Sequence, residues 1–258
     1  MARRIVFKSA GRGIKMRAKE AAPEAGREWL GFEPDEKQAE LLKRDVRRLL
    51  LNCTRQWGKS TITAAKAVAR ARDRAGSLTL VVSPSARQSG EFLRKAAAFV
   101  RRLGIRPRGD GDNEISLLLP NGSRLVGLPG TEATVRGFSA VSLMLIDEAA
   151  RVSDELYVAV RPMLAVGDGD LWLMSTPFGK RGFFWEAWEK GGPQWERVAV
   201  PATECPRIPA SFLEEERAAL GERWFRQEYL CEFVDANDAV FRREEVERAI
   251  TEEVKPLF

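Results

Sequence analysis

Residues 49 to 61 read LLLNCTRQWGKST, and this stretch decides which fold the chain can adopt. The three leucines at its start are typical of a buried strand, and the Ala-rich run over residues 61–74 predicts a helix. Between the two lies a polar loop that ends in Gly58, Lys59 and Ser60. Strand, loop and helix thus follow one another in the order of a phosphate-binding P-loop.

Such a loop captures anions, because backbone N–H groups of the loop and of the first helical turn point inward and the helix dipole adds to their field. Lys59 would reach the outer phosphates of a nucleotide, and Ser60 would offer its hydroxyl to Mg²⁺. The usual pattern has glycine where this chain has Cys53, so an ordinary helix capped by Ser60 is the alternative. The predicted nucleotide-binding residues of the loop are Thr54, Arg55, Gln56, Trp57, Gly58, Lys59, Ser60 and Thr61.

A second apolar run, residues 142–146, predicts a buried strand that delivers Asp147 and Glu148 at its carboxyl end, which is the layout of a Walker B motif. Asp147 would hold Mg²⁺, and Glu148 would orient and deprotonate the attacking water. Acids at a strand end can also cap a following helix, but the P-loop upstream favours a nucleotide site. The predicted cofactors are therefore ATP and Mg²⁺.

Predicted strands and helices alternate along the chain, which indicates a parallel sheet whose ligands gather at the carboxyl ends of the strands. A turn at 120–122 predicts an antiparallel hairpin inserted into or beside this sheet. The predicted fold class is α/β: a P-loop NTPase of the ASCE or RecA-like type, with a mostly parallel central sheet flanked by helices and a small helical lid. Further strands are predicted at 78–82, 171–174 and 195–200, and further helices at 88–103 and 182–190.

We expect three parts: a basic, loosely ordered N-terminal arm at 1–30, a P-loop ATPase core at 31–201, and a helical lid subdomain with a linker at 202–258. The composition changes beyond Pro201 and supports the last boundary.

Within the lid, Ser211 with Glu214 predicts a capping box, and Gly221 is expected to end the first helix. Two further helices are predicted over 222–234 and 241–250. The helix that begins near Ser211 and the helix over 222–234 are expected to turn their aromatic side chains inward and their acids outward.

A helix is also predicted over 32–48, and it places Gln38 three residues after Asp35. Gln38 could complete a capping box with Asp35. Alternatively, Gln38 reads the adenine while Phe32 stacks on the base, and both roles could coexist.

Three residues beside the site have two interpretations each. Ser175 and Thr176, at the end of a predicted strand, could sense the γ-phosphate and couple hydrolysis to movement, or they could only form a turn. Arg136, in a Gly-flanked segment, could be an arginine finger that reaches a neighbouring subunit's phosphates, or a turn residue that contacts DNA or solvent.

The basic charge of the chain is unevenly distributed. Residues 212–258 contain 13 acidic and 7 basic side chains, whereas the whole chain carries +5. Basic residues cluster in the first 19 residues and again over 87–108, which suits a polyanion such as double-stranded DNA on one side of the molecule. The candidate DNA-binding residues are Arg101, Arg102, Arg106 and Arg124, although helix-dipole compensation would also explain Arg101 and Arg102.

The chain contains no histidine, and its three cysteines lack C-x-x-C spacing, which excludes His-based catalysis and most zinc sites. No apolar stretch approaches the length of a membrane span. A reduced, cytoplasmic and soluble protein is expected.

Taken together, the motifs resemble one family, the large terminase subunit that packages the genomes of tailed bacteriophages and herpes-type viruses. The resemblance rests on the segment around Gln38, TRQWGKS, TVRG followed by LMLIDEAA, MSTP and WFRQEYLCEF, and it covers about residues 30 to 245.

The resemblance implies an ATP-hydrolysing motor that translocates double-stranded DNA into a viral capsid. It implies a homo-oligomeric ring, a pentamer on the portal, with the portal protein and the small terminase subunit as partners. The implied location is the cytoplasm of the infected host cell, transiently at the procapsid portal. By the same resemblance Arg55 acts on the phosphates, Ser175 and Thr176 couple hydrolysis to movement, and Arg136 acts in trans.

Members of this family usually carry a C-terminal nuclease, and this sequence stops where it would begin, so no DNA cleavage is expected from this chain. Two alternatives remain. A helicase-like or restriction-type motor fragment shares these motifs, and a nucleotide-dependent assembly switch would use ATP to order a surface.

Overall fold

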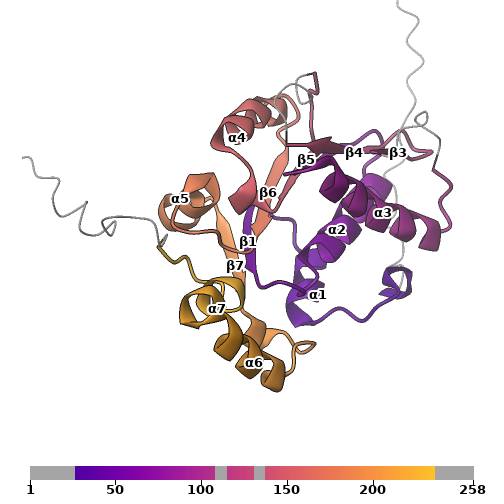
Figure 1. Ribbon diagram of the computed structural model, residues 1–258. Coiled ribbons are helices and arrows are strands. Elements are labelled where there is room, and N and C mark those ends of the chain that lie inside the picture. The colour runs from indigo at the N-terminus through magenta and orange to yellow at the C-terminus, as the bar shows by residue number, and fades with distance from the viewer. Residues whose placement is uncertain (1–26, 108–114, 131–136, 236–258) are drawn as a thin grey trace, which may run out of the picture.

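The computed structural model describes residues 27–107, 115–130 and 137–235, and its centre is a seven-stranded sheet (Figure 1). The strand order is β3-β4-β2-β5-β6-β1-β7, and among the described strands only the β3–β4 pair is antiparallel. The strands are β1 Arg48–Cys53, β2 Leu78–Ser83, β3 Ser116–Leu118, β4 Arg124–Pro129, β5 Leu143–Asp147, β6 Asp170–Ser175 and β7 Glu196–Val200. The predicted mostly parallel sheet is confirmed, and the predicted hairpin forms its β3–β4 edge.

Helices connect the strands. They are α1 Glu36–Lys43, α2 Lys59–Asp73, α3 Ala86–Arg102, α4 Asp154–Val160, α5 Gly182–Lys190, α6 Ala210–Leu220 and α7 Glu222–Glu228, with the short 3₁₀ turns η1 Arg27–Leu30, η3 Ala149–Arg151, η4 Arg161–Leu164 and η5 Ala202–Glu204. Both α2 and α3 begin two residues before their predicted starts, because Gly58 and Ser85 are their N-caps. The predicted helix over 32–48 is too long, since α1 ends at Lys43 and Arg48 already belongs to β1.

Side chains of β1 alternate between two hydrophobic cores, one on each face of the sheet. Leu49 and Leu51 pack into the core that α1, α2 and α3 cover, whereas Leu50 packs into the core that α4 and α5 cover. Figure 1 shows these two helical layers on opposite sides of the sheet. With both faces covered, the central strands β1, β2, β5 and β6 are buried over nearly their whole length and consist mainly of apolar residues, as the sequence predicts.

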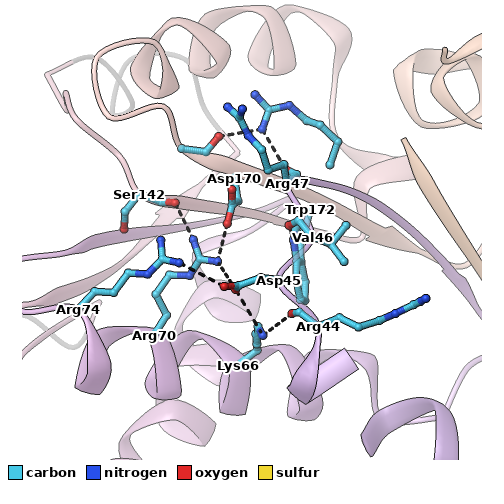
Figure 2. A network of polar contacts seen from close by, with 12 residues as sticks. Arg44, Asp45, Val46, Arg47, Lys66, Arg70, Arg74, Ser142, Asp170 and Trp172 are labelled. Carbon is cyan, nitrogen blue, oxygen red and sulfur yellow. Dashed lines mark hydrogen bonds and ion pairs between the residues drawn. The ribbon is translucent and has the colours of Figure 1, made fainter. Parts of the chain in front are cut away.

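A polar network fixes α2 to the amino-terminal edge of the sheet (Figure 2). The buried Arg70 donates to the Ser142 carbonyl at 3.0 Å and forms an ion pair with Asp170. One turn earlier, Lys66 donates to the Leu42 carbonyl at 3.0 Å. Trp172 of β6 donates its indole N–H to the Val46 carbonyl at 2.7 Å. The bonds of Lys66 and Arg70 hold the C-terminal half of α2, whereas the Trp172 bond ties β6 to the segment that precedes β1.

Two features predicted for the lid differ from the structure. The predicted Ser211–Glu214 capping box is wrong, because α6 begins after Pro209 and has no side-chain cap, so Ser211 lies inside the first turn. The helix predicted over 222–234 ends at Glu228. There the chain leaves helical geometry, and the Tyr229 carbonyl accepts a hydrogen bond from the Ala202 N–H at 2.6 Å.

The aromatic side chains of the lid do not all face inward. Phe225 is buried, as expected, but Trp224 is 44% exposed and Phe212 is 41% exposed. Gly221 ends α6 with φ +76°, as predicted.

The predicted arm is too long at its C-terminal end, because η1 carries Leu30 into the core and sets Trp29 edge-on against Phe99 with ring centroids 5.7 Å apart. Residues 1–26 and the helix predicted over 241–250 lie outside the described residues. None of the described helices has the length and hydrophobicity needed to cross a bilayer.

Candidate functional site

The loop between β1 and α2 is built as a P-loop. Its last residue, Gly58, has φ +94° and serves as the N-cap of α2 without any side-chain cap bond. A Cβ there would lie 3.2 Å from Gln38 Nε2, so glycine suits both the conformation and the close approach. The alternative in which Ser60 caps an ordinary helix is wrong, since Ser60 lies within the first turn of α2.

The start of α2 and the end of β5 meet at this loop. Ser60 Oγ donates to Asp147 Oδ2 at 2.9 Å, and Lys59 Nζ lies 2.8 Å from Glu148 Oε1. Glu148 has φ +52° and ψ +43°, a left-handed conformation that non-glycine residues seldom adopt and that recurs at functional sites. The four residues that the two motifs single out therefore form one cluster.

Burial and mutual charge perturb this cluster. Burial raises the pKa of Asp147, and the nearby Lys59 only partly opposes that rise. Burial would lower the pKa of Lys59, but the charges of Glu148 and Asp147 outweigh it, so that pKa is raised and Lys59 stays protonated. Burial also raises the pKa of the Cys53 thiol well above its usual value, so Cys53 behaves as an inert core residue in the position where glycine is usual.

The oxygen atoms of Ser60 and Asp147 fit a Mg²⁺ ion. The hydroxyl and the carboxylate converge to 2.9 Å, and hard oxygen donors of this kind are those that Mg²⁺ prefers. The second carboxylate oxygen, Asp147 Oδ1, accepts the Glu148 N–H at 3.1 Å, which fixes the orientation of the group.

Gln38 is tied to the P-loop. Its backbone N–H and side-chain Oε1 complete the predicted capping box with Asp35, which is confirmed, and its Nε2 donates to the Trp57 carbonyl at 2.8 Å. Arg207 also donates to that carbonyl, at 2.6 Å, and lies 3.1 Å from Asp35 Oδ2. Phe32 lies against Phe99, with ring centroids 6.4 Å apart.

Sequence reasoning missed Arg207. It belongs to no motif, and its bond to Trp57 spans 150 positions of the chain.

The remaining P-loop residues differ in exposure. The Trp57 side chain is buried in the core, so only its backbone N–H is left to bind a phosphate. Thr54 is buried and its N–H donates to the Val200 carbonyl at 2.9 Å. Arg55 and Gln56 are exposed, and Arg55 reaches Glu228 of α7.

Ser175 and Thr176 join the end of β6 to both motifs. Ser175 Oγ accepts the Ala150 N–H at 3.2 Å, just after Glu148, and Thr176 Oγ1 donates to the Cys53 carbonyl at 2.9 Å, just before the P-loop. Ser175 thus contacts the segment that follows Glu148, and Thr176 contacts the residue that precedes the P-loop.

The candidate DNA-binding residues lie away from this cluster. The start of α3 contacts Leu128 at the carboxyl end of β4, so Arg101 and Arg102, at the end of this 17-residue helix, lie near the opposite edge of the sheet. Arg124 begins β4 at that edge. Arg101, Arg102 and Arg106 are all exposed, and Arg102 in addition donates to the Leu30 carbonyl and so contacts η1. Arg136 lies outside the described residues.

A strand, P-loop and helix that meet two acids at the end of β5, with β6 between β1 and β5, define a P-loop NTPase of the ASCE class. More narrowly, the chain belongs to the family described as "Terminase large subunit, T4likevirus-type, N-terminal", whose model matches residues 50–248.

Named relatives agree with this family. The terminase large subunit of Thermus phage G20c is 26% identical over 249 residues, which cover 83% of this chain and 51% of that protein. A probable terminase large subunit of Enterobacteria phage P7 is 29% identical over 139 residues, covering 49% of this chain and 28% of that protein. The chain thus spans about half the length of the first of these relatives, and less of the second.

Solved structures support the fold. The large terminase ATPase domain of Thermus phage P74-26 has a TM-score of 0.70 at 23% identity, covering 81% of this chain and 97% of that one. The large terminase of another thermophilic bacteriophage, solved in complex with ATP-gamma-S, has a TM-score of 0.62 at 14% identity, covering 77% of this chain and 52% of that one.

Proposed function

We propose that this chain is the ATP-hydrolysing part of a motor that translocates double-stranded DNA into a viral capsid. The observation that carries the proposal is the cluster at the P-loop, where Lys59 and Ser60 meet Glu148 and Asp147 at 2.8 and 2.9 Å. A cation for the outer phosphates, two oxygen ligands for a metal and a carboxylate beside them are the groups that phosphoryl transfer to water requires.

Each residue then has one role. Lys59 neutralises the outer phosphates, and Ser60 with Asp147 holds Mg²⁺, which supplies charge neutralisation when bound. Glu148 orients the attacking water and accepts its proton. Because Lys59 pairs with Glu148 in this structure, phosphates that draw the ammonium toward themselves leave the Glu148 carboxylate available to the water.

Residues around the cluster extend these roles. Gln38 and Phe32 hold the adenine side of the nucleotide, and the P-loop from Thr54 to Thr61 wraps the phosphates. Arg55 contacts the γ-phosphate in cis and Arg136 contacts a neighbour's phosphates in trans. The hydrogen bonds of Ser175 and Thr176 to segments beside both motifs support their coupling role.

The partners follow from the family and from charge. We propose a homo-oligomeric ring, a pentamer on the portal, that contacts the portal protein and the small terminase subunit. It acts in the cytoplasm of the infected host cell, transiently at the procapsid portal. Arg101, Arg102, Arg106 and Arg124 are proposed to contact DNA phosphates irrespective of sequence.

Replacing the proposed base tests the function. Glu148→Gln keeps the shape of the side chain but removes its basicity, so DNA-stimulated ATP hydrolysis should fall by about 10²- to 10⁴-fold while ATP binding survives. Steady-state hydrolysis and calorimetric binding of ATP to the whole chain measure the two quantities.

Glu196→Gln is the matched control, because Glu196 pairs with Arg44 at the surface, on β7 and away from the cluster. Unchanged hydrolysis in Glu148→Gln would refute the role of Glu148.

A further inference from the structure

Two adjacent residues at the end of α7 touch all three loops of the proposed nucleotide site. Gln227 and Glu228 are polar, yet they are only 3% and 9% exposed. Polar side chains that are buried this deeply have partners, and here the partners come from the loops that follow β1, β5 and β6.

The first partner is the P-loop. Arg55 Nε donates to Glu228 Oε2 at 2.5 Å, and Thr54 Oγ1 donates to the backbone carbonyl of Glu228 at 3.1 Å. The lid is therefore joined to two consecutive P-loop residues through a single residue of α7.

The other two loops meet the same pair. Arg151, three residues after Glu148, brings its Nη2 to 3.7 Å from Glu228 Oε1 and stacks on the ring of Phe178 at 4.3 Å. The Gly179 N–H, in the loop after β6, donates to Gln227 Oε1 at 3.1 Å. Gln227 in turn donates to Glu228 Oε1 at 3.3 Å. Both oxygens of the Glu228 carboxylate thus have partners: Arg55 of the P-loop contacts Oε2, and Arg151 and Gln227 contact Oε1.

Because the contact between Arg55 and Glu228 is an ion pair, another anion could replace Glu228 as the partner of Arg55. The carboxylate of Glu228 is 12% exposed and needs a cation, whereas the Arg55 side chain is 59% exposed. The hydrogen bond to Glu228 raises the pKa of Arg55. A guanidinium binds a phosphate with the same geometry as a carboxylate, so a γ-phosphate in the P-loop would compete with Glu228 for Arg55.

We propose that Glu228 is a positioning residue that holds Arg55 on the lid when the site is empty, and that bound nucleotide takes Arg55 from Glu228 and thereby loosens α7. This inference rests on the proposed function and deepens it, because it names the residue through which the lid responds to nucleotide. Arg151 remains with Glu228 after the exchange, so the carboxylate is not left without a cation.

The experiment compares Glu228→Gln with Glu232→Gln in the whole chain. Glu232 pairs with Arg226 beyond the end of the same helix and at the surface, so it serves as the matched control. Removing the competitor frees Arg55, so Glu228→Gln should lower the Kd for ATP-gamma-S roughly three- to tenfold, the range of a modest ion pair. A merely structural role of Glu228 would weaken binding instead.

Two further readouts sharpen the test. In an Arg55→Gln background, Glu228→Gln should no longer change the Kd, because the competition requires both residues. Hydrogen exchange of amides in 222–230 should rise on adding nucleotide to the original chain, and should already be high without nucleotide in Glu228→Gln. Equal or weaker binding by Glu228→Gln, or an effect that persists without Arg55, would overturn the proposal.

Failure of this inference is separable from failure of the proposed function. If Lys59→Ala binds ATP-gamma-S as well as the original chain does, the nucleotide site itself is wrong. If binding depends on Lys59 but not on Glu228, only the lid contact is refuted. Should Glu228→Gln not fold, Arg55→Gln alone carries the test, since α7 exchange must then be high without nucleotide and unchanged by adding it.

Discussion

Gly58 is the single residue on which the geometry of the P-loop depends most. Its φ of +94° turns the chain into α2, so that Lys59 and Ser60 emerge at the start of the helix beside Asp147 and Glu148. The same residue leaves room for the Gln38 amide, whose Nε2 would be 3.2 Å from any Cβ there. Backbone conformation and tertiary contact thus converge on one position.

Gly58→Ala should therefore weaken nucleotide binding as well as destabilise the fold. A non-glycine residue in this conformation costs about 1–3 kcal/mol, and thermal or denaturant unfolding measures that loss. Gly76→Ala is the control, because Gly76 has φ +71° with nothing within 4 Å and lies beyond the far end of α2. Both variants should lose stability, but only Gly58→Ala should raise the Kd for ATP; equal affinities would contradict the role assigned to Gly58.

The element that carries the site is α2, and it is held at both ends. Its N-terminus forms the P-loop cluster, and its C-terminal half is fixed by Arg70 and Lys66 in the network of Figure 2. Because α2 is Ala-rich, it packs closely on the sheet with Ala64, Ala67 and Ala71 fully buried. Ile62 and Val68 add larger apolar contacts, and the polar network ties the C-terminal half of the helix to its surroundings.

Removing Arg70 should be costly for the fold. Arg70→Ala leaves Asp170 buried without its cation, and breaking a buried ion pair in this way costs about 3–5 kcal/mol. Denaturant unfolding at neutral pH checks the value. The control is Arg74→Ala at the C-cap of the same helix, because the Arg74 side chain is 54% exposed and pairs with Asp45 at 3.5 Å, so its loss should stay below about 1 kcal/mol. A loss below about 1 kcal/mol in Arg70→Ala as well would show that its ion pair with Asp170 contributes little.

Across the whole molecule, the P-loop cluster and the candidate DNA-binding arginines lie at opposite ends of the strands. The acids and the P-loop gather at the carboxyl ends of the strands, whereas Arg124 and the C-terminal end of α3 with Arg101 lie toward the amino ends. A motor with this layout would grip DNA at a distance from the phosphates that it hydrolyses. We propose two links between the nucleotide site and the DNA contacts. One is movement of the lid, through Glu228, and the other is movement of the carboxyl end of β6, through Ser175.

Salt dependence tests the DNA contacts. Each phosphate contact contributes about 0.9 to the slope of log affinity against log salt, so Arg101→Gln with Arg106→Gln should reduce that slope by about 1.8 and weaken binding to all sequences alike. Titration of duplex DNA at several salt concentrations measures it.

Arg87→Gln is the control, since Arg87 is exposed at the other end of α3. An unchanged slope in the double variant would remove Arg101 and Arg106 from the interface. Arg102 is left out because it holds the Leu30 carbonyl.

Local sequence signals identify the residues of the site where each motif is contained within a few consecutive positions. The spacing of Gly58, Lys59 and Ser60 and the acids after an apolar strand predicted the cluster, and Asp35 with Gln38 predicted a real capping box. The same pattern failed at Ser211, because α6 already begins after Pro209 and that side chain lies past the helix start. A cap motif predicts a helix start only when no earlier residue, such as Pro209 here, already begins the helix.

The sequence by itself determined the class of this protein: a P-loop NTPase with a mostly parallel sheet, and the identity of the four residues at its centre. Only the tertiary structure decided which residues support that centre, because the contacts of Arg207 with Trp57 and of Glu228 with Arg55 join positions 150 and 173 residues apart. Motif spacing and helix propensity act over a few residues, whereas these contacts exist only once the sheet order has brought the strand ends together and α7 has folded over them.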